Sequence, residues 1–90
     1  MTDAPETIVA AAIQWEGLTY SLPRPARHAH VLWCAADSVG EQYLSYVCQG
    51  FLTSDGRFVN RIQARHIAYR AGQNPKTTGN EQELFSEDLW

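Results

Sequence analysis

The sequence predicts a small α+β fold of one domain, spanning residues 1–90. Three observations lead to this prediction. Two apolar runs near the N-terminus flank a short turn, two later segments carry apolar residues at helical spacing, and the last seven residues become apolar again. We therefore expect an N-terminal β-hairpin, two main helices, further short strands and an ordered C-terminal tail. A chain of this length builds a modest core, so self-association into a homo-oligomer is also expected.

The hairpin is expected over residues 8–15 and 17–22. Its first strand, IVAAAIQW, is apolar and carries β-branched residues, and its second strand alternates as LTYSL. Glu16 and Gly17 form the turn signal between the two strands. Pro23 ends the second strand, because proline has no backbone N–H to donate.

The first helix is expected over residues 26–37. Pro25 suits the first position of a helix, where a missing N–H costs nothing, so the helix would begin at Pro25 or Ala26. The apolar face of this helix consists of Val31, Cys34 and Ala35. Cys34 and Cys48 are expected to be free, buried thiols, because the chain has only these two cysteines and no export signal.

Residues 42–53 are rich in strand-forming residues, and a turn over Thr53–Gly56 follows them. This turn either closes a short hairpin or leads directly into the second helix, which is expected over residues 61–71. Asn60 is the expected N-cap of that helix, and Gln63 completes a capping-box pattern. The buried face of the helix consists of Ala64, Ile67, Ala68 and Ala71.

Gly72 is expected to end the second helix, since glycine is the preferred residue just after a helix C-terminus. Residues 73–83 are polar and are expected to form a loop. The tail over residues 84–90, LFSEDLW, is expected to pack back onto the domain. Its apolar residues would otherwise be exposed to water.

Positive charge is concentrated in the middle of the chain. All seven basic residues lie between positions 24 and 76, six of them are arginine, and only three acids share that segment. Arginine presents a planar fork of donors that suits phosphate and carboxylate groups. The pattern favours a compact anionic ligand over a nucleic acid, which usually requires more lysine and more total charge.

The proposed binding site joins two expected helix starts. The candidate ligand-binding residues are Arg24, Arg27, His28, Arg57, Asn60 and Arg61. They lie where the backbone N–H groups of a helix N-terminus would add a positive dipole end. Tyr20, Tyr43 or Tyr46 would stack on a base. Arg65 and Arg70 are expected on an ordinary solvated helix face.

Metal binding and catalysis are weaker interpretations of the same residues. His28 and His30 are two residues apart and would point to nearly opposite sides of a helix, and the sequence has no CxxC or HxxxH spacing. We therefore expect no metal ion and no cofactor. Cys34, on an apolar face, is expected to be inert. His28 acting as general acid or base on a phosphoester, with Arg27 steadying the phosphate, stays open as an alternative.

Targeting signals are not expected. The sequence has no run of eighteen apolar residues, which a membrane-spanning helix would need. The N-terminus carries acids where a signal peptide requires a basic start. A cytoplasmic location is therefore expected, with no membrane partner.

Three stretches of the chain resemble a family of short phage and prophage proteins. They are SLPRPARHAHVL, QGFLTSDGRFVNRIQARHIAYRAGQ and the final LFSEDLW, and together they contain 44 of the 90 residues. The matching residues are Leu22, Pro23, Pro25, Arg27, His28, Gln49, Gly50, Phe51, Gly56, Arg57, Phe58, Arg61, Ala71, Gly72, Gln73, Ser86, Glu87, Asp88, Leu89 and Trp90. His30 stands where the family has histidine, aspartate or another polar residue, which argues against His30 as an essential ligand. Arg65 and His66 stand where acids or alanines are expected, so these two are particular to this member.

The resemblance implies a phage protein that acts in the cytoplasm of an infected bacterial host. Small phage proteins often disarm host defence by sequestering a nucleotide signal or by covering a defence protein. We therefore expect a non-enzymatic binder, or sponge, of a phosphate-bearing, nucleotide-like defence signal. One alternative is a protein-binding inhibitor that uses Trp33, Trp90 and the acidic tail, and a second is a small phosphodiesterase that uses His28.

Overall fold

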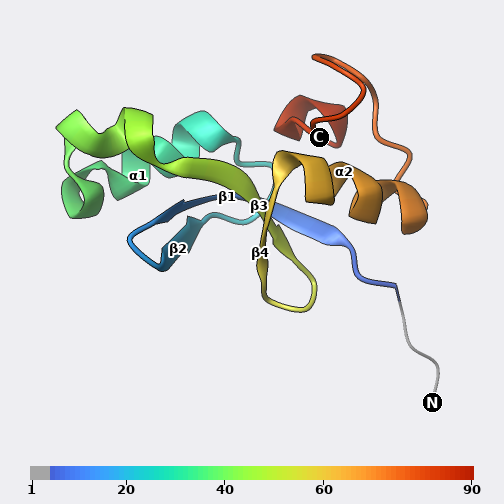
Figure 1. Cartoon of the computed structure of the whole chain (residues 1–90), viewed down its shortest axis with the longest axis horizontal. Coiled ribbons are helices and arrows are strands. Elements are labelled where there is room, and N and C mark those ends of the chain that lie inside the picture. The colour runs from blue at the N-terminus through green and yellow to red at the C-terminus, as the bar shows by residue number, and fades with distance from the viewer. Residues whose placement is uncertain (1–4) are drawn as a thin grey trace.

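A computed structural model describes residues 5–90, and its centre is a four-stranded antiparallel sheet with the strand order β2-β1-β3-β4 (Figure 1). β1 (Ile8–Trp15) and β2 (Leu18–Ser21) form the expected N-terminal hairpin. Its two turn residues, Glu16 and Gly17, have φ values of 49° and 81°. Positive φ at both central positions matches the right-handed twist of the two strands, and glycine adopts it without strain.

The other two strands form a second hairpin that continues directly into a helix. β3 (Cys48–Thr53) pairs with β1, and β4 (Phe58–Asn60) pairs with β3. Gly56, in the turn between them, has a φ of 83°. α2 (Arg61–Arg70) begins at the residue after β4. The turn after β3 therefore both closes a hairpin and leads into the second helix, which were the two outcomes left open by the sequence.

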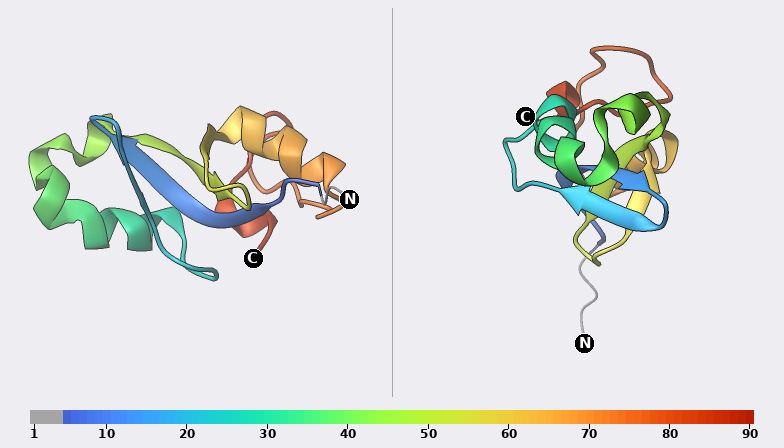
Figure 2. Two further views of the ribbon diagram at one scale, coloured as in Figure 1. Left: turned by 90° about the horizontal axis from the view of Figure 1, so that it is seen from below. Right: turned by 90° about the vertical axis from the view of Figure 1, so that its left-hand side faces the viewer.

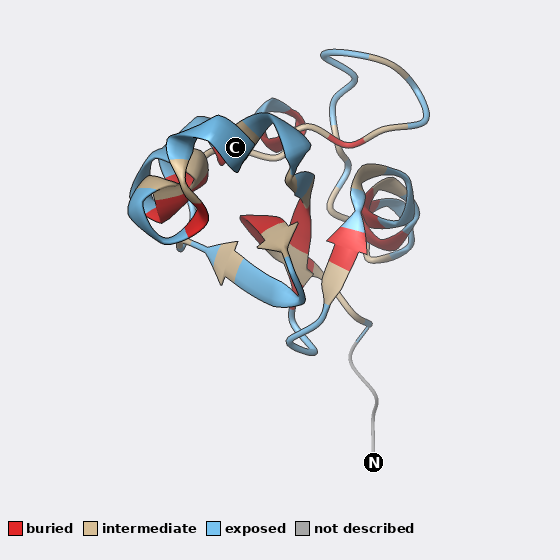
Figure 3. Ribbon diagram, turned by 60° about the vertical axis from the view of Figure 1, so that its left-hand side comes forward, coloured by how far each residue is buried: buried red, intermediate tan, exposed pale blue. Residues whose placement is uncertain are grey.

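Both long helices and the C-terminal tail lie on one face of the sheet, so the domain has two layers (Figure 2). α1 (His28–Val39) lies against β1 and β2, whereas α2 lies against β3 and β4. The buried residues gather where the sheet faces the helices (Figure 3). The hydrophobic core among them consists of Ile8, Ala11, Ile13, Val31, Ala35, Val39, Phe51, Val59, Ala64, Ile67, Ala68 and Leu84. The α+β prediction and its order of elements are confirmed.

The prediction for the start of α1 was wrong by one short turn. Ala26 donates its N–H to the Pro23 carbonyl at 3.1 Å, which closes a turn before the helix. Arg27 is extended, with φ −107° and ψ 172°, and forms the N-cap. Its N–H donates to Nδ1 of His30 at 3.0 Å, so α1 begins at His28 and not at Pro25 or Ala26.

A second correction concerns the segment that was expected to be β-rich. Residues Glu41–Tyr46 form the 3-10 helix η1, and only the residues from Cys48 onward join the sheet. Tyr43 stacks on Trp15 with ring centroids 5.5 Å apart. This aromatic contact anchors η1 against the end of the first hairpin, and it overrides the strand preference of the segment.

The expectation that both cysteines are buried was also wrong, because both are free and exposed. Val31 and Ala35 are buried residues of α1, whereas Cys34 lines an open cavity between α1 and β2. Cys48 pairs with Gln14, whose side chain lies on the sheet face that carries no helix. In both cases the residue type suggested burial, whereas its position in the element decided the exposure.

The tail packs back as expected. It contains the short 3-10 helix η2 (Ser86–Asp88), and Leu84, Ser86 and Asp88 are buried. The edge of the Trp90 ring packs on Phe51 in the core, with centroids 6.3 Å apart. Across residues 5–90, none of the helices is long and apolar enough to cross a membrane.

Candidate functional site

Several arginines of the basic middle segment hold the C-terminal tail. We call this arrangement the tail clasp: Arg27, Arg61 and Arg65 together with residues 84–90. Arg65 is its centre, with Nη2 at 2.6 Å from Oδ2 of the buried Asp88. The same guanidinium donates to the carbonyls of Glu83 and Lys76 at 3.2 and 3.0 Å. Arg65 therefore fixes the tail, and the expectation that it lies on a solvated face was wrong.

Asp88 receives further donors within the tail clasp. Its carboxylate accepts hydrogen bonds from the N–H and Oγ1 of Thr78, both at 2.7 Å, and from the N–H of Phe85 at 2.9 Å. Burial alone would raise the pKa of Asp88, but these hydrogen bonds and the charge of Arg65 outweigh it, so the pKa is lowered. Asp88 is therefore ionised and fully bonded inside the fold.

Arg61 joins α2 to the tail and to β3. Its Nη1 donates to the Leu84 carbonyl at 3.1 Å, and its Nη2 donates to Oε1 of Gln49. The guanidinium also lies 4.6 Å from the centre of the Phe85 ring. Burial lowers the pKa of Arg61, and the nearby carboxylates oppose that shift. Arg61 is therefore half-buried, and its guanidinium is bonded to groups of the protein itself.

The start of α1 meets the same tail. Arg27 forms an ion pair with Glu87, with Nη1 and Oε1 3.1 Å apart. Arg24 lies over the Trp90 ring, 5.3 Å from its centre. The indole N–H of Trp90 donates to the Ala26 carbonyl at 3.1 Å. The tail thus lies beside the arginines that the sequence assigned to an anionic ligand.

His28 and Asn60 make contacts that stabilise the fold. The His28 ring is buried, its Nε2 lies 2.6 Å from the Gly50 carbonyl oxygen, and its edge packs on Phe51. Burial lowers the pKa of His28, so the neutral ring donates to that carbonyl. Asn60 accepts from the Gln63 N–H at 2.8 Å, and Gln63 Oε1 accepts from the Asn60 N–H at 3.0 Å. The predicted capping box is confirmed.

A different group of basic side chains lines an open cavity beside α2. We call it the α2 cavity; its volume is about 460 Å³, and it is lined by Arg57, Gln63, His66, Ile67 and Arg70. The four α2 residues recur at the spacing of one helical face, and Arg57 comes from the turn between β3 and β4. A smaller cavity of about 260 Å³ adjoins Arg70 and is lined also by Pro5, Glu6 and Ile67.

Glu6 holds Arg57 in place at the rim of the α2 cavity. Its two carboxylate oxygens accept from Nε and Nη2 of Arg57 at 2.7 and 2.8 Å, a bidentate pair. The hydrogen bonds from Arg57 and Thr53 lower the pKa of Glu6 to about 2. The same pair raises the pKa of Arg57. The guanidinium plane is therefore oriented before any ligand arrives.

The six candidate residues thus divide among three regions. Arg24, Arg27 and His28 lie at the tail side, and Arg57 lines the α2 cavity. Asn60 and Arg61 line a separate cavity of about 380 Å³, whose wall also includes the acid Glu83. Sequence reasoning missed His66 and Arg70 as cavity residues, although their spacing with Gln63 on one helical face was a usable signal.

The described part of the chain offers no group of three His, Cys, Asp or Glu side chains that could hold a metal ion. What the α2 cavity offers instead is hydrogen-bond donors: two guanidinium groups, a side-chain amide and an imidazole. Such a set can bind a phosphate or carboxylate group through charge-assisted hydrogen bonds.

The structure therefore defines a small two-layer α+β protein with a clasped tail and a cavity lined by two arginines and a histidine. Residues 7–90 match the family model of the phage T4 y16D protein, and the chain belongs to that family. The expectation of a phage protein family is thereby confirmed. Comparisons with curated proteins and with solved structures gave no match.

Proposed function

We propose that this phage protein binds a phosphate-bearing, nucleotide-like small molecule in the α2 cavity and sequesters it without cleaving it. The observation that carries the proposal is the convergence of Arg57, His66 and Arg70 on one cavity. Three basic side chains around one opening favour an anion of more than one charge.

The size of the α2 cavity and the ordering of Arg57 before a ligand binds both support the proposal. Its volume of about 460 Å³ falls within the range of roughly 300–1,000 Å³ that is typical of small-molecule sites. Arg57 is held by Glu6, so a ligand would not have to order that side chain on binding. Ile67 supplies an apolar part of the wall, against which a base or ribose could pack.

Membership of a phage family supports a role in the infected bacterial host, and a host defence signal of nucleotide type fits the chemistry of the cavity. Sequestration of a ligand requires only hydrogen-bond donors and a cavity of matching shape. The phosphodiesterase alternative placed the chemistry on His28, whose ring packs on Phe51 and bonds to Gly50 in the interior. A reaction at the α2 cavity would instead have to use His66.

The first experiment is a thermal-shift and calorimetry screen of the purified protein. We expect cyclic dinucleotides, cyclic oligonucleotides or ADP-ribose-type nucleotides to raise the melting temperature, and binding to weaken as salt is added. A ligand recovered intact after denaturation of the complex identifies a sponge, and a cleaved ligand identifies an enzyme. If no nucleotide of the panel binds, the proposal is wrong.

The protein-binding alternative has one observation in its favour, because Trp33 is 81 % exposed on α1. Trp90, its proposed partner, is only partly exposed and bonds to Ala26. A pull-down from infected host lysate, comparing the natural protein with Trp33→Ala, tests this alternative. Loss of a specific host protein in the variant would favour an inhibitor over a sponge.

A further inference from the structure

We propose that the open edge of β2 pairs with β2 of a second copy of this chain, so that two four-stranded sheets join across a two-fold axis. The inference concerns the edge of the sheet opposite to β4, whereas the α2 cavity adjoins the β3–β4 turn. It is therefore independent of the proposed ligand.

The backbone N–H and C=O groups of β2 that are not bonded to β1 determine how a further strand can pair with this edge. Trp15 and Leu18 face each other across a two-residue turn, so this pair exchanges hydrogen bonds. Antiparallel pairs alternate, and Ile13 and Tyr20 form the next bonded pair. The N–H and C=O groups of Thr19 and Ser21 therefore point away from β1, toward the open edge.

Other strand backbone at the edges of this sheet is covered by a side chain or continues directly into a helix. At the start of β1, beyond the reach of β2, the side chain of Gln73 bonds both backbone groups of Ile8, accepting from its N–H at 2.9 Å and donating to its C=O at 3.0 Å. β4 is three residues long and continues into α2. β2, in contrast, has the sequence LTYS, with no charge, no proline and no bulge. Charged residues, prolines and bulges normally prevent edge pairing, so β2, although only four residues long, is the edge that is open to pairing.

The sequence of β2 is complementary to itself about Tyr20. An antiparallel pair centred on Tyr20 places Thr19 opposite Ser21 of the second copy. These two residues exchange backbone hydrogen bonds, and their small polar side chains lie on the sheet face without helices. On the helix face it places Tyr20 opposite Tyr20, and Leu18 opposite Leu22. Leu18 is 61 % exposed in the single chain, so this register covers an apolar side chain that is otherwise in water.

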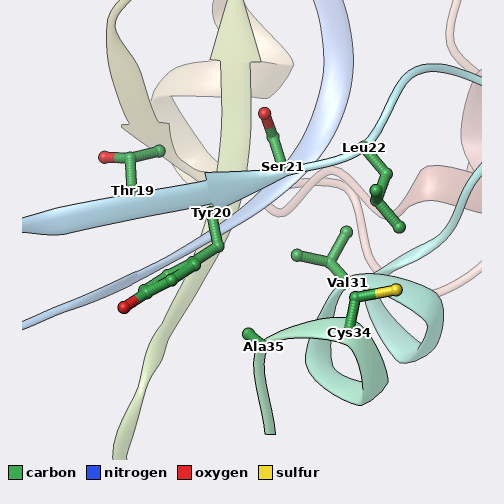
Figure 4. Close-up of a pocket in the computed structure, with 7 residues that line it drawn as sticks. All are labelled: Thr19, Tyr20, Ser21, Leu22, Val31, Cys34 and Ala35. Atoms are coloured by element: carbon green, nitrogen blue, oxygen red, sulfur yellow. The ribbon is translucent and has the colours of Figure 1, made fainter. Parts of the chain in front are cut away.

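The space between β2 and α1 has room for the second copy. A cavity of about 330 Å³ lies there, lined by Thr19–Leu22 on the strand and by Val31, Cys34 and Ala35 on the helix. Figure 4 shows Tyr20 and Leu22 on the α1 side of β2, and Thr19 and Ser21 on the other side. α1 packs mainly on β1, so Tyr20 of the second copy can enter the cavity beside Tyr20 of the first.

Disulfide trapping tests this register. In a Cys34→Ser/Cys48→Ser background, Tyr20→Cys should form a covalent dimer on mild oxidation, because non-bonded pairs bring the two Cα atoms to about 4.5 Å. Thr19→Cys is the matched control. In this register the Thr19 residues of the two copies are diagonal neighbours. Their Cα atoms lie roughly 7–8 Å or more apart, which is too far for a disulfide. Equal cross-linking of both variants, or of neither, would overturn the proposal.

Sedimentation of the unmodified protein is the second test. We expect a concentration-dependent dimer that Thr19→Lys/Ser21→Lys converts to a folded monomer, because the register brings the new charges of the two copies together. Thr77→Lys, in the exposed 73–83 loop, adds a charge elsewhere and should leave the dimer intact. A protein that stays monomeric at high concentration, with an unchanged circular dichroism spectrum, contradicts the proposal.

Discussion

The tail clasp and the α2 cavity both depend on arginines of the same helix, yet their chemistry differs. In the tail clasp, Arg61 and Arg65 are bonded to carbonyls, an amide and a carboxylate of the protein itself. In the α2 cavity, Arg57 has one carboxylate partner, and Arg70 lies with His66 at an open surface. Whether an arginine is available to a ligand therefore depends on what the fold places opposite it.

Helical geometry explains the division. Arg61 and Arg65 are four residues apart and share one side of α2, on which the tail lies. His66 and Arg70 are also four apart, but His66 follows Arg65 directly and therefore lies about 100° further around the helix. A one-residue offset thus separates arginines that hold the fold from those that face a cavity.

The largest effect is expected from Arg65→Ala. Removing this side chain leaves the buried Asp88 without its cation, so the free energy of unfolding should fall by about 3 kcal/mol. Chemical denaturation measures the change. Arg70→Ala, on the same helix, serves as the control and should change stability by less than about 0.5 kcal/mol. Equal losses for the two variants would remove the distinction between the two regions.

Ligand affinity gives the complementary test. Once a nucleotide that binds has been found, Arg70→Ala should weaken its binding about tenfold, which corresponds to one lost charge-assisted hydrogen bond. Arg27→Ala should leave the affinity unchanged, because Arg27 is paired with Glu87. Calorimetry measures the ligand affinity of both variants. If Arg27→Ala loses the ligand and Arg70→Ala keeps it, the ligand binds at the tail side, as the sequence first indicated.

The pH dependence of stability should reveal the buried His28. Burial lowers its pKa below the ordinary value of 6.5, so the unfolded chain takes up a proton more readily than the folded protein. Stability should therefore be fully present above pH 6.5 and decrease as the pH falls toward the lowered pKa. His28→Gln, which can still donate to Gly50, should flatten this slope. An unchanged slope in the variant would assign the effect to another group.

The smallest effect is expected at the exposed Glu6–Arg57 pair. NMR titration of the Glu6 carboxyl should give a midpoint near 2, and Arg57→Ala should return it toward 4.5. Since the pKa of Glu6 is depressed in the folded protein, its contribution is present above pH 4.5 and is lost as the pH falls toward 2. A Glu6 midpoint that does not move in Arg57→Ala would mean that the pair does not form in solution.

Local patterns predicted much of the fold. The first hairpin, the N-cap of α2 and the packing of the tail each depend on neighbouring residues: Glu16-Gly17 for the turn, Asn60 and Gln63 for the cap, and an apolar LFSEDLW segment. The start of α1 was misplaced because Pro25 is part of a turn that Ala26 and Pro23 close, and proline at a helix start looks the same in sequence.

The site was harder to predict, because it depends on contacts between distant segments. The sequence showed a basic middle and an acidic end, but not that the acid at Asp88 meets Arg65, or that Glu87 meets Arg27. Equally, Glu6 reaches Arg57 across fifty-one positions. Helical spacing alone could have grouped Gln63, His66 and Arg70, whereas their cavity also requires the turn that carries Arg57.

The clasped tail also has a consequence for the order in which the chain folds. The indole of Trp90 bonds to Ala26, 64 positions away, and Gln73 bonds to Ile8 across 65 positions. Contacts of such sequence separation raise the contact order and slow folding, because the loop must close before they form. The contacts that the tail makes with the turn before α1 and with the arginine side of α2 can therefore form only after residues 84–90 have been made.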